Sequence, residues 1–327
     1  MTLFTLLIVM ALERVVVKSK TFHITTLAQH YFSFITRLLQ KKNIQQPKYQ
    51  LGVIATMLLV AGFPSLVVWM LVVYLPAILV FFLYLILLWV CLGCPVTRQT
   101  YKRYLQAANK ENFEACSLYS EQFGNKGGDL SNVGKQLVLV NYRQYASVII
   151  FFVLLGLPGM VFYSLCKEWY FLQTSKIHND DAHNSQNAQC NIDYSEAILE
   201  PQSDNGHITQ HSVNEPASER LNEHHDGAND TQKVLFILDW MPARVTAFGF
   251  LLVGHFSRGL PVWLETFANV KLNAYDVLAK VAKASEDLPT SENPHLQEPL
   301  QMVKLVKRNI IFFLMVISVM TLVGVVS

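Results

Sequence analysis

The chain has 327 residues, of which 52% are hydrophobic and only 15% are charged, and its formal net charge at pH 7 is +2. Charged residues usually make up about a quarter of a soluble globular domain, so this composition argues against a soluble protein and indicates an integral membrane protein. The basic loops lack the aromatic residues and the charge density that nucleic-acid binding requires, which excludes that class of function. We expect the N-terminus to be retained, because no cleavable signal peptide is recognisable.

The first segment, residues 1–50, begins with a short apolar helix and continues as a basic stretch. The apolar run ends at Glu13 and Arg14 and is too short to span a membrane, which takes about 20 apolar residues. We expect this helix to lie in the membrane interface or to be partly inserted. The alternative is a sixth membrane helix that places the N-terminus outside.

Residues 51–94 are apolar throughout and too long for a single span. Pro76 cannot continue a helical hydrogen-bond ladder from its own nitrogen, so we expect a hairpin of two membrane helices. Cys91 and Cys94 form a C-x-x-C pair at the end of this run. A zinc site needs about four ligands and no second pair lies nearby, so we predict packing cysteines and no metal site.

Residues 95–146 form a basic loop, which we expect to be helical. Within it, residues 97–123 have the amphipathic pattern of one cytoplasmic helix or of a helix pair. The glycine cluster at 124–129 lacks the spacing of a phosphate-binding loop, so we expect a plain turn there.

A third membrane helix is expected at residues 147–171, where Gly156 and Pro158 interrupt the apolar run. Residues 172–232 are polar and acidic, and such a composition predicts a disordered periplasmic insertion. Six of the ten histidines lie in this insertion, which raises the alternative of zinc or copper capture. A plain solvated insertion is the interpretation we prefer, and it predicts that residues 178–230 can be removed without loss of function.

The fourth membrane helix, at residues 233–257, contains the motif DWMPAR, which is unusually polar for a span. Proline is best tolerated in the first turn of a helix, so Pro242 predicts a broken helix that starts anew there. Asp239 would then precede the helix start, where a negative charge is favourable. Arg244 would lie at membrane depth, where a bare charge costs at least about 3 kcal/mol.

The polar residues of this helix allow two interpretations. Helical periodicity places His255 on nearly the same face as Arg244, and Arg258 about 40° away. The first interpretation is an ion pair between Asp239 and Arg244 that fixes the broken helix against its neighbours. The second is an anion-binding cavity at a helix N-terminus. The candidate functional residues are those of the motif, the cationic stripe and the N-terminal charged pair: Asp239, Trp240, Pro242, Arg244, His255, Arg258, Glu13 and Arg14.

Residues 258–308 and a fifth membrane helix at 309–327 complete the chain. Apolar residues at spacings of three and four predict an amphipathic helix at 262–284. Basic residues are concentrated in three regions, the N-terminal segment and the two loops, whereas the polar insertion has eleven acids and two basic residues. Because cytoplasmic flanks carry the excess of lysine and arginine, five spans place the basic regions in the cytoplasm and the insertion outside.

The chain resembles the AmpE family of inner-membrane regulatory proteins linked to β-lactamase induction in Gram-negative bacteria. The resemblance is carried by MTLFTLLIVMALER at the start, YLQAANKEN near residue 104, VLFILDWMPAR, and VGHFSRGLPVW at 253–263. It runs from end to end apart from the insertion. A more distant similarity, carried by GLPGMVFY (156–163) and DWMPAR, links the chain to the CbiB/CobD membrane synthases, which attach an aminopropanol-type linker during cobamide assembly.

These resemblances imply two hypotheses for an all-α polytopic protein of the bacterial inner membrane. In the first, the protein is a non-enzymatic sensor or transducer of cell-wall recycling and the β-lactam response. Its partners would be membrane lipids, an anionic small-molecule ligand, and the cytoplasmic amidase AmpD or another wall-recycling component. In the second, the protein is an enzyme with a synthase-like site around Asp239 and Arg244. No nucleophile–base motif is present, so we predict no catalytic residue and no cofactor.

Overall fold

The computed structural model describes residues 2–15, 24–41, 50–93, 95–125, 130–196, 215–286 and 294–324, and every regular element in these residues is helical. The α-helices are α1 (Thr2–Val15), α2 (Ile24–Lys41), α3 (Gln50–Tyr74), α4 (Ala77–Cys91), α5 (Pro95–Asn109), α6 (Phe113–Gln122), α7 (Val133–Asn141), α8 (Ser147–Glu196), α9 (Glu215–Val253), α10 (Phe256–Ala268), α11 (Ala274–Ser285) and α12 (Pro294–Leu322). A 3-10 turn, η3 (Leu130–Asn132), precedes α7, and a π-helical turn, η4 (Tyr142–Ala146), follows it. The predicted all-helical fold class is confirmed.

Five helical stretches are long and apolar enough to cross a membrane: Ile54–Tyr74, Ala77–Asn109, Leu130–Leu172, Thr231–Val253 and Leu296–Leu322. They confirm the five expected membrane helices in number and order. The apolar part of α1, Thr2–Glu13, is shorter; at 1.5 Å per residue α1 is about 21 Å long, less than a hydrocarbon core of about 30 Å. It packs against α4 and α12, and its partial insertion stays a prediction.

The spans in α8 and α9 are the inner ones. In their most apolar windows 61% and 56% of the residues are buried, against 22%, 29% and 33% for the spans of α3, α4 and α12. Large apolar side chains are exposed on these outer helices, among them Leu59, Phe63, Trp69, Ile78, Phe82, Met315 and Val319. Apolar surface of this extent is unusual on a soluble monomer, and a lipid bilayer would cover it.

The interruption predicted at Gly156 is present. Inside α8 this residue has φ 69° and ψ −161°, a backbone conformation that only glycine adopts readily. Backbone groups freed at such a break need partners inside the protein. The hydroxyl of Ser65 on α3 donates a hydrogen bond to the carbonyl of Pro158 at 2.7 Å, so α3 supports the break.

The break predicted at Pro242 is wrong. Helix α9 passes through this residue without interruption, so Asp239 lies inside a helix and not before one. A proline removes one amide donor from the ladder, and membrane helices tolerate this where packing and side chains compensate. Here α9 packs against α8 and α11, and this packing supports the helix through the proline.

The region between the second and third spans contains a helix pair, one of the two alternatives expected there. The segment 97–123 is the helix pair α5–α6, in which the side chain of Asn112 accepts a hydrogen bond from the amide of Ala115 at 3.0 Å and begins α6. This pair forms a separate small core with α7 and α12. Cys116 is buried in it, and burial raises the pKa of its thiol, which makes it poorly reactive.

The helix predicted at 262–284 is two helices, α10 and α11, separated at residues 269–273. Helix α2, which the sequence did not predict, packs on α8 through Phe32 and Trp169, whose ring centroids lie 4.9 Å apart edge to face. Helix α2 is amphipathic, but its segment was interpreted only as a basic stretch, so no helix was predicted there.

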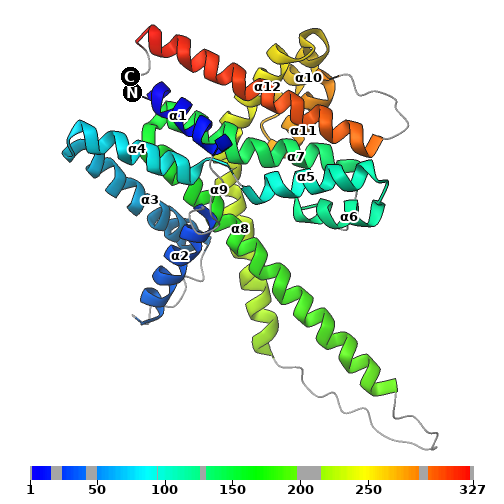
Figure 1. Cartoon of the computed structure of the whole chain (residues 1–327). Coiled ribbons are helices and arrows are strands. Elements are labelled where there is room, and N and C mark those ends of the chain that lie inside the picture. The colour runs from blue at the N-terminus through cyan, green and yellow to red at the C-terminus, as the bar shows by residue number, and fades with distance from the viewer. Residues whose placement is uncertain are drawn as a thin grey trace, which may run out of the picture.

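The polar insertion is helical over more of its length than its composition predicts. Figure 1 shows α8 and α9 running side by side away from the other helices, and they extend to Glu196 and from Glu215. Extending an existing helix costs much less than starting one, which explains this difference. Residues 197–214 lie outside the described residues, so the disorder predicted there stays a prediction. Residues 126–129 and Cys94 also lie outside them, so the plain turn and the packing role expected there stay predictions too.

Candidate functional site

The site is organised around η4, the π-helical turn between α7 and α8. Because its hydrogen bonds run from i to i+5, a π turn holds more residues than an α-helical turn, and π turns inside α-helices often occur at functional sites. Side chains three positions apart therefore diverge more than on an α-helix. Tyr142 and Tyr145, both buried, reach two different carboxylates from this one turn.

The first carboxylate is Asp239 on α9, which is only 2% exposed. One of its oxygens, Oδ1, accepts hydrogen bonds from the hydroxyls of Tyr142 at 3.0 Å and Tyr163 at 2.8 Å. The Nε of Arg143 lies 4.0 Å from the other oxygen. We call these four residues the Asp239 cluster. A buried carboxylate is costly unless it is bonded and paired, and this cluster supplies both.

Lys167 and Glu168 extend this cluster along α8. Both side chains are almost fully buried, and Lys167 Nζ lies 3.8 Å from Glu168 Oε1. The same ammonium donates a hydrogen bond to the carbonyl of Arg143 at 3.2 Å, and the guanidinium of Arg143 lies 5.3 Å from the ring centroid of Phe171. Intramembrane ionisable residues are functional candidates by default, so we include Lys167 and Glu168 in the candidate site.

Arg244 does not pair with Asp239 in the structure. Its guanidinium donates hydrogen bonds to the carbonyls of Trp240 at 3.1 Å, Asn269 at 2.9 Å and Thr266 at 3.5 Å. It also lies 4.4 Å from the ring centroid of Trp240. Two of these carbonyls are at the end of α10, where the last carbonyls of a helix lack partners and the dipole is negative.

Both interpretations of the motif therefore need correction. The predicted ion pair between Asp239 and Arg244 is wrong, because each side chain has its own partners. The predicted anion cavity at a helix N-terminus is not found here either, because Arg244 binds a helix C-terminus. Trp240 is half-buried beside Arg244, and Pro242 is buried in the uninterrupted α9.

The cationic stripe is not formed. Helix α9 ends at Val253, and His255 lies in the non-helical connection that starts α10. The periodicity that aligned His255 and Arg258 with Arg244 ends at this break. Both residues are exposed, whereas Arg244 is buried, so the structure does not bring them together.

The second carboxylate is Glu13 on α1. It accepts a hydrogen bond from the hydroxyl of Tyr145 at 2.6 Å and pairs with Arg98 on α5, whose Nη2 lies 2.9 Å away. Arg98 also donates to the hydroxyl of Tyr145 at 3.0 Å. We call these three residues the Glu13 cluster. These bonds connect Glu13 to α5 and η4 and not to the DWMPAR motif, and the side chain of Arg14 lies outside the described residues.

Gly93 explains how the Glu13 cluster fits against the α4–α5 connection. Its φ is 72° and its amide donates to the carbonyl of Gln144 on η4 at 3.2 Å. A Cβ at this position would collide with the carboxylate of Glu13 and the hydroxyl of Tyr145. Glycine is needed both for the backbone conformation and for this close approach.

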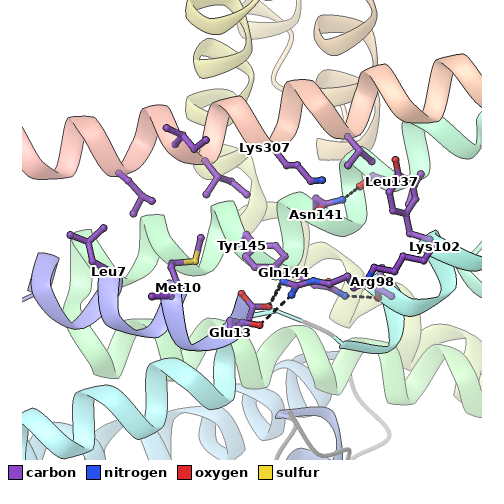
Figure 2. A pocket seen from close by; sticks show the side chains of 17 residues that line it. Leu7, Met10, Glu13, Arg98, Lys102, Leu137, Asn141, Gln144, Tyr145 and Lys307 are labelled. Atoms are coloured by element: carbon purple, nitrogen blue, oxygen red, sulfur yellow. Dashed lines mark hydrogen bonds and ion pairs between the residues drawn. The ribbon is translucent and has the colours of Figure 1, made fainter. Parts of the chain in front are cut away.

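A pocket of about 780 Å³ opens beside the Glu13 cluster. Its lining comes from α1, α5, α7, η4 and α12: Leu7, Met10, Ala11, Glu13, Thr97, Arg98, Tyr101, Lys102, Leu137, Asn141, Gln144, Tyr145, Val303, Lys307, Ile310, Ile311 and Leu314. Figure 2 shows Leu7 and Met10 at one end and Arg98 and Lys102 at the other. Pockets of about 300–1,000 Å³ are typical of ligand sites.

The sequence did not reveal most of the residues that bond to Asp239 and Glu13. Tyr142, Tyr163 and Tyr145 look like ordinary aromatic residues of an apolar segment, and nothing in their spacing indicates a carboxylate partner. Lys167 and Glu168 could have been found, because two charges inside the apolar third span are as unusual as those of DWMPAR. Among the described residues no group of three or more His, Cys, Asp or Glu could hold a metal ion.

Comparison with known proteins adds a family. A family model described as "Regulatory signalling modulator protein AmpE" matches residues 1–193 and 217–327. The Protein AmpE of Shigella flexneri is 28% identical over 104 residues, which cover 31% of this chain and 35% of that protein. The match thus spans well under two thirds of the length of this relative. No solved structure matches. Residues 194–216, which the family model leaves out, lie within the polar insertion.

Proposed function

Because the chain belongs to the AmpE family of regulatory signalling modulator proteins, we propose that it is a non-enzymatic transducer in the bacterial inner membrane. In this role it modulates β-lactamase induction and cell-wall recycling together with the amidase AmpD. The ligand enters the pocket beside Glu13, and the inner helices α8 and α9 transmit its presence.

One observation carries the transducer proposal: a single π-helical turn contacts both carboxylates, the buried Asp239 and the partly buried Glu13. Tyr145 bonds to Glu13 at the pocket, and Tyr142 bonds to Asp239 between α8 and α9. A ligand that changes the bonding of Glu13 changes the position of Tyr145. Because Tyr142 and Tyr145 both belong to η4, a movement of Tyr145 also moves Tyr142 and changes its bond to Asp239. Such a response needs an element with two arrangements that the ligand favours differently.

The proposed topology has five spans, with the basic loops in the cytoplasm. The polar end of the pocket carries Lys102 from α5 and Lys307 from α12, both of which belong to the basic loops. An excess of lysine and arginine favours the cytoplasmic side. The pocket would therefore open towards the cytoplasmic boundary of the membrane, where a signal can reach soluble partners.

The alternative of a synthase centred on DWMPAR has no specific observation in its favour. The carboxylate of Asp239 and the guanidinium of Arg244 are buried, and each is engaged by protein groups. A catalytic group needs access to a substrate within hydrogen-bond reach. The partnership with AmpD rests on the resemblance, and co-purification of AmpD with the solubilised full chain tests it.

The experiment that tests the transducer proposal measures β-lactamase induction. The full chain is expressed in a Gram-negative host that has an inducible β-lactamase and lacks its own family member. Tyr145→Phe removes the hydroxyl that bonds to Glu13 and keeps the ring. We expect it to shift the dose of β-lactam that gives half-maximal induction, while the protein level in the membrane is unchanged.

Tyr74→Phe is the matched control, because Tyr74 is 77% exposed on the outer face of α3. This variant makes the same chemical change away from the pocket, and its induction curve should follow that of the wild type. If Tyr145→Phe and Tyr74→Phe give the same curve as the wild type, the proposed coupling through η4 is wrong.

A further inference from the structure

The pocket beside the Glu13 cluster has a polar end with a surplus of positive charge. Arg98, Lys102 and Lys307 line it, with Glu13 as its single carboxylate. Arg98 and Glu13 pair with each other. Lys102 and Lys307 have no ion-pair partner in the part of the chain that the structure describes, and Figure 2 shows both side chains at this end. Two lysines are thus available for an anion.

The opposite end of the pocket is apolar, and its α12 residues belong to a helix that is long and apolar enough to cross a membrane. It is formed by Leu7, Met10 and Ala11 of α1 and by Ile310, Ile311 and Leu314 of α12. Lys307 and Arg308 are the last charged residues of the chain, and residues 309–324 carry no charge. The boundary between the two ends of the pocket therefore coincides with the start of the uncharged part of a membrane span.

The sequence order on α1 shows the same polarity. Leu7 and Met10 line the apolar end, and Glu13 lies one turn further along at the polar end. Helix α12 likewise places Lys307 at the polar end and Ile310, Ile311 and Leu314 at the apolar end, and Figure 2 shows the order Leu7, Met10, Glu13 along α1. A ligand that fits this lining is an amphiphile with an anionic head and an apolar chain.

We propose that this pocket binds a membrane lipid with a phosphate-containing anionic headgroup, held between Lys102 and Lys307 with part of its chain along α1 and α12. A basic recess beside membrane helices is a usual lipid-headgroup site, and a volume of about 780 Å³ accommodates a headgroup and part of a chain. The proposal rests on the proposed transducer function, because it names the ligand class of the same pocket.

The test uses the purified full chain in a neutral detergent supplemented with phosphatidylcholine. Phosphatidic acid is titrated and the thermal unfolding temperature is followed; the concentration that gives half of the stabilisation is the apparent affinity. The variant Lys102→Gln with Lys307→Gln removes both lysines. We expect its apparent affinity to fall about 25-fold, because each basic residue near an anionic lipid contributes roughly a factor of five.

Lys110→Gln with Lys304→Gln is the matched control. Lys110 directly follows α5, and Lys304 lies on α12. Both lysines are exposed, and neither lines the pocket. This double variant should bind phosphatidic acid as the wild type does. Equal loss in the two double variants, or equal stabilisation by phosphatidic acid and additional phosphatidylcholine, would overturn the proposal.

A second arm separates a lipid from a free phosphate. Inorganic phosphate and glycerol 3-phosphate carry the same charge without a chain, and we expect neither to stabilise the protein at the concentrations at which phosphatidic acid does. If they stabilise it as well as the lipid does, the occupant is a soluble phosphate and the lipid proposal is wrong.

Failure of this proposal can be told apart from failure of the transducer proposal. If phosphatidic acid does not bind but Tyr145→Phe still shifts β-lactamase induction, the lipid assignment fails and the transducer stands. If the lysine double variant loses lipid binding without any change in induction, the lipid site stands and its role in transduction fails.

Discussion

Asp239 and Arg244 lie five positions apart on α9 and serve different purposes. Asp239 connects α9 to η4 and α8 through two tyrosine hydroxyls, whereas Arg244 connects α9 to the end of α10. The sequence identified both residues, because charges inside an apolar span stand out. It could not identify their partners: Tyr142 lies 97 positions from Asp239 and Tyr163 lies 76 positions away. Hydroxyls at such separations leave no spacing signal.

At this scale the first prediction concerns Asp239→Ala. The change leaves the buried hydroxyl of Tyr163 without its acceptor, leaves that of Tyr142 only the backbone carbonyl of residue 239, and removes the carboxylate beside Arg143. Breaking a buried charge pair on one side costs about 3 kcal/mol or more, whereas Tyr163→Phe removes a single hydrogen bond and costs about 1 kcal/mol. Thermal unfolding in detergent should rank Asp239→Ala well below Tyr163→Phe. Equal unfolding temperatures would contradict the cluster.

The second prediction is that Arg244→Lys is not a conservative change. A lysine cannot bond to the three carbonyls and also stack on Trp240, because it lacks the planar fork of arginine. We expect a loss of about 2 kcal/mol and faster amide hydrogen exchange at the end of α10. The control Arg103→Lys changes an exposed arginine on α5 and should stay within about 0.5 kcal/mol of the wild type. Matching exchange rates in the two variants would refute this role.

At the scale of helices, the sequence was right about Gly156 and wrong about Pro242. Glycine permits a backbone conformation that other residues avoid, and α8 uses it for a real break. Proline only removes one donor, so the surrounding packing decides the outcome. The separation of α10 from α11 was not predictable for the same reason. Arg244 of α9 bonds to the final carbonyls of α10, and this contact with another helix is not visible in the pattern of residues 262–284.

The third prediction compares two glycines. Gly156→Ala places a Cβ on a residue with φ 69° and ψ −161°, which costs about 1–3 kcal/mol. Gly62→Ala, inside α3, meets open space and should stabilise the protein by roughly 0.5–1 kcal/mol, because alanine is the better helix former. The two unfolding temperatures should move in opposite directions. A shift of the same sign would show that the break at Gly156 is absent in the membrane.

At the scale of the whole molecule, composition and apolar run length were sufficient to predict five membrane helices and their order. They were insufficient to predict which spans lie inside, since the span of α8 is more apolar than that of α3 and is nevertheless far more buried. In a bilayer the most apolar surface faces lipid, and the polar contacts are internal. The pocket between α1, α5 and α12 was also beyond the sequence, because these helices are far apart along the chain.

The fourth prediction concerns the polar insertion. Residues 194–216 are left out by the family model, so replacing them with a short Gly-Ser linker should leave membrane insertion and β-lactamase induction unchanged. Removing 178–230 also shortens α8 and α9, and we expect the same outcome. If only the longer deletion impairs induction, the extended helices take part in function and the interpretation of a plain solvated insertion is wrong.

The central claim is that η4 couples the pocket to the Asp239 cluster, and a double-mutant cycle tests it most directly. Glu13→Gln alters the pocket side and Tyr163→Phe the Asp239 side, and the hydrogen bonds of these two residues go to different partners, Tyr145 and Asp239. The dose of β-lactam for half-maximal induction is measured for the wild type, both single variants and the double variant. Independent sites give additive effects in free energy, and coupled sites deviate. We predict that each single variant shifts this dose and that the double variant departs from the product of the two shifts by about threefold or more. Single variants that leave the dose unchanged, or a double variant equal to that product, would contradict the coupling.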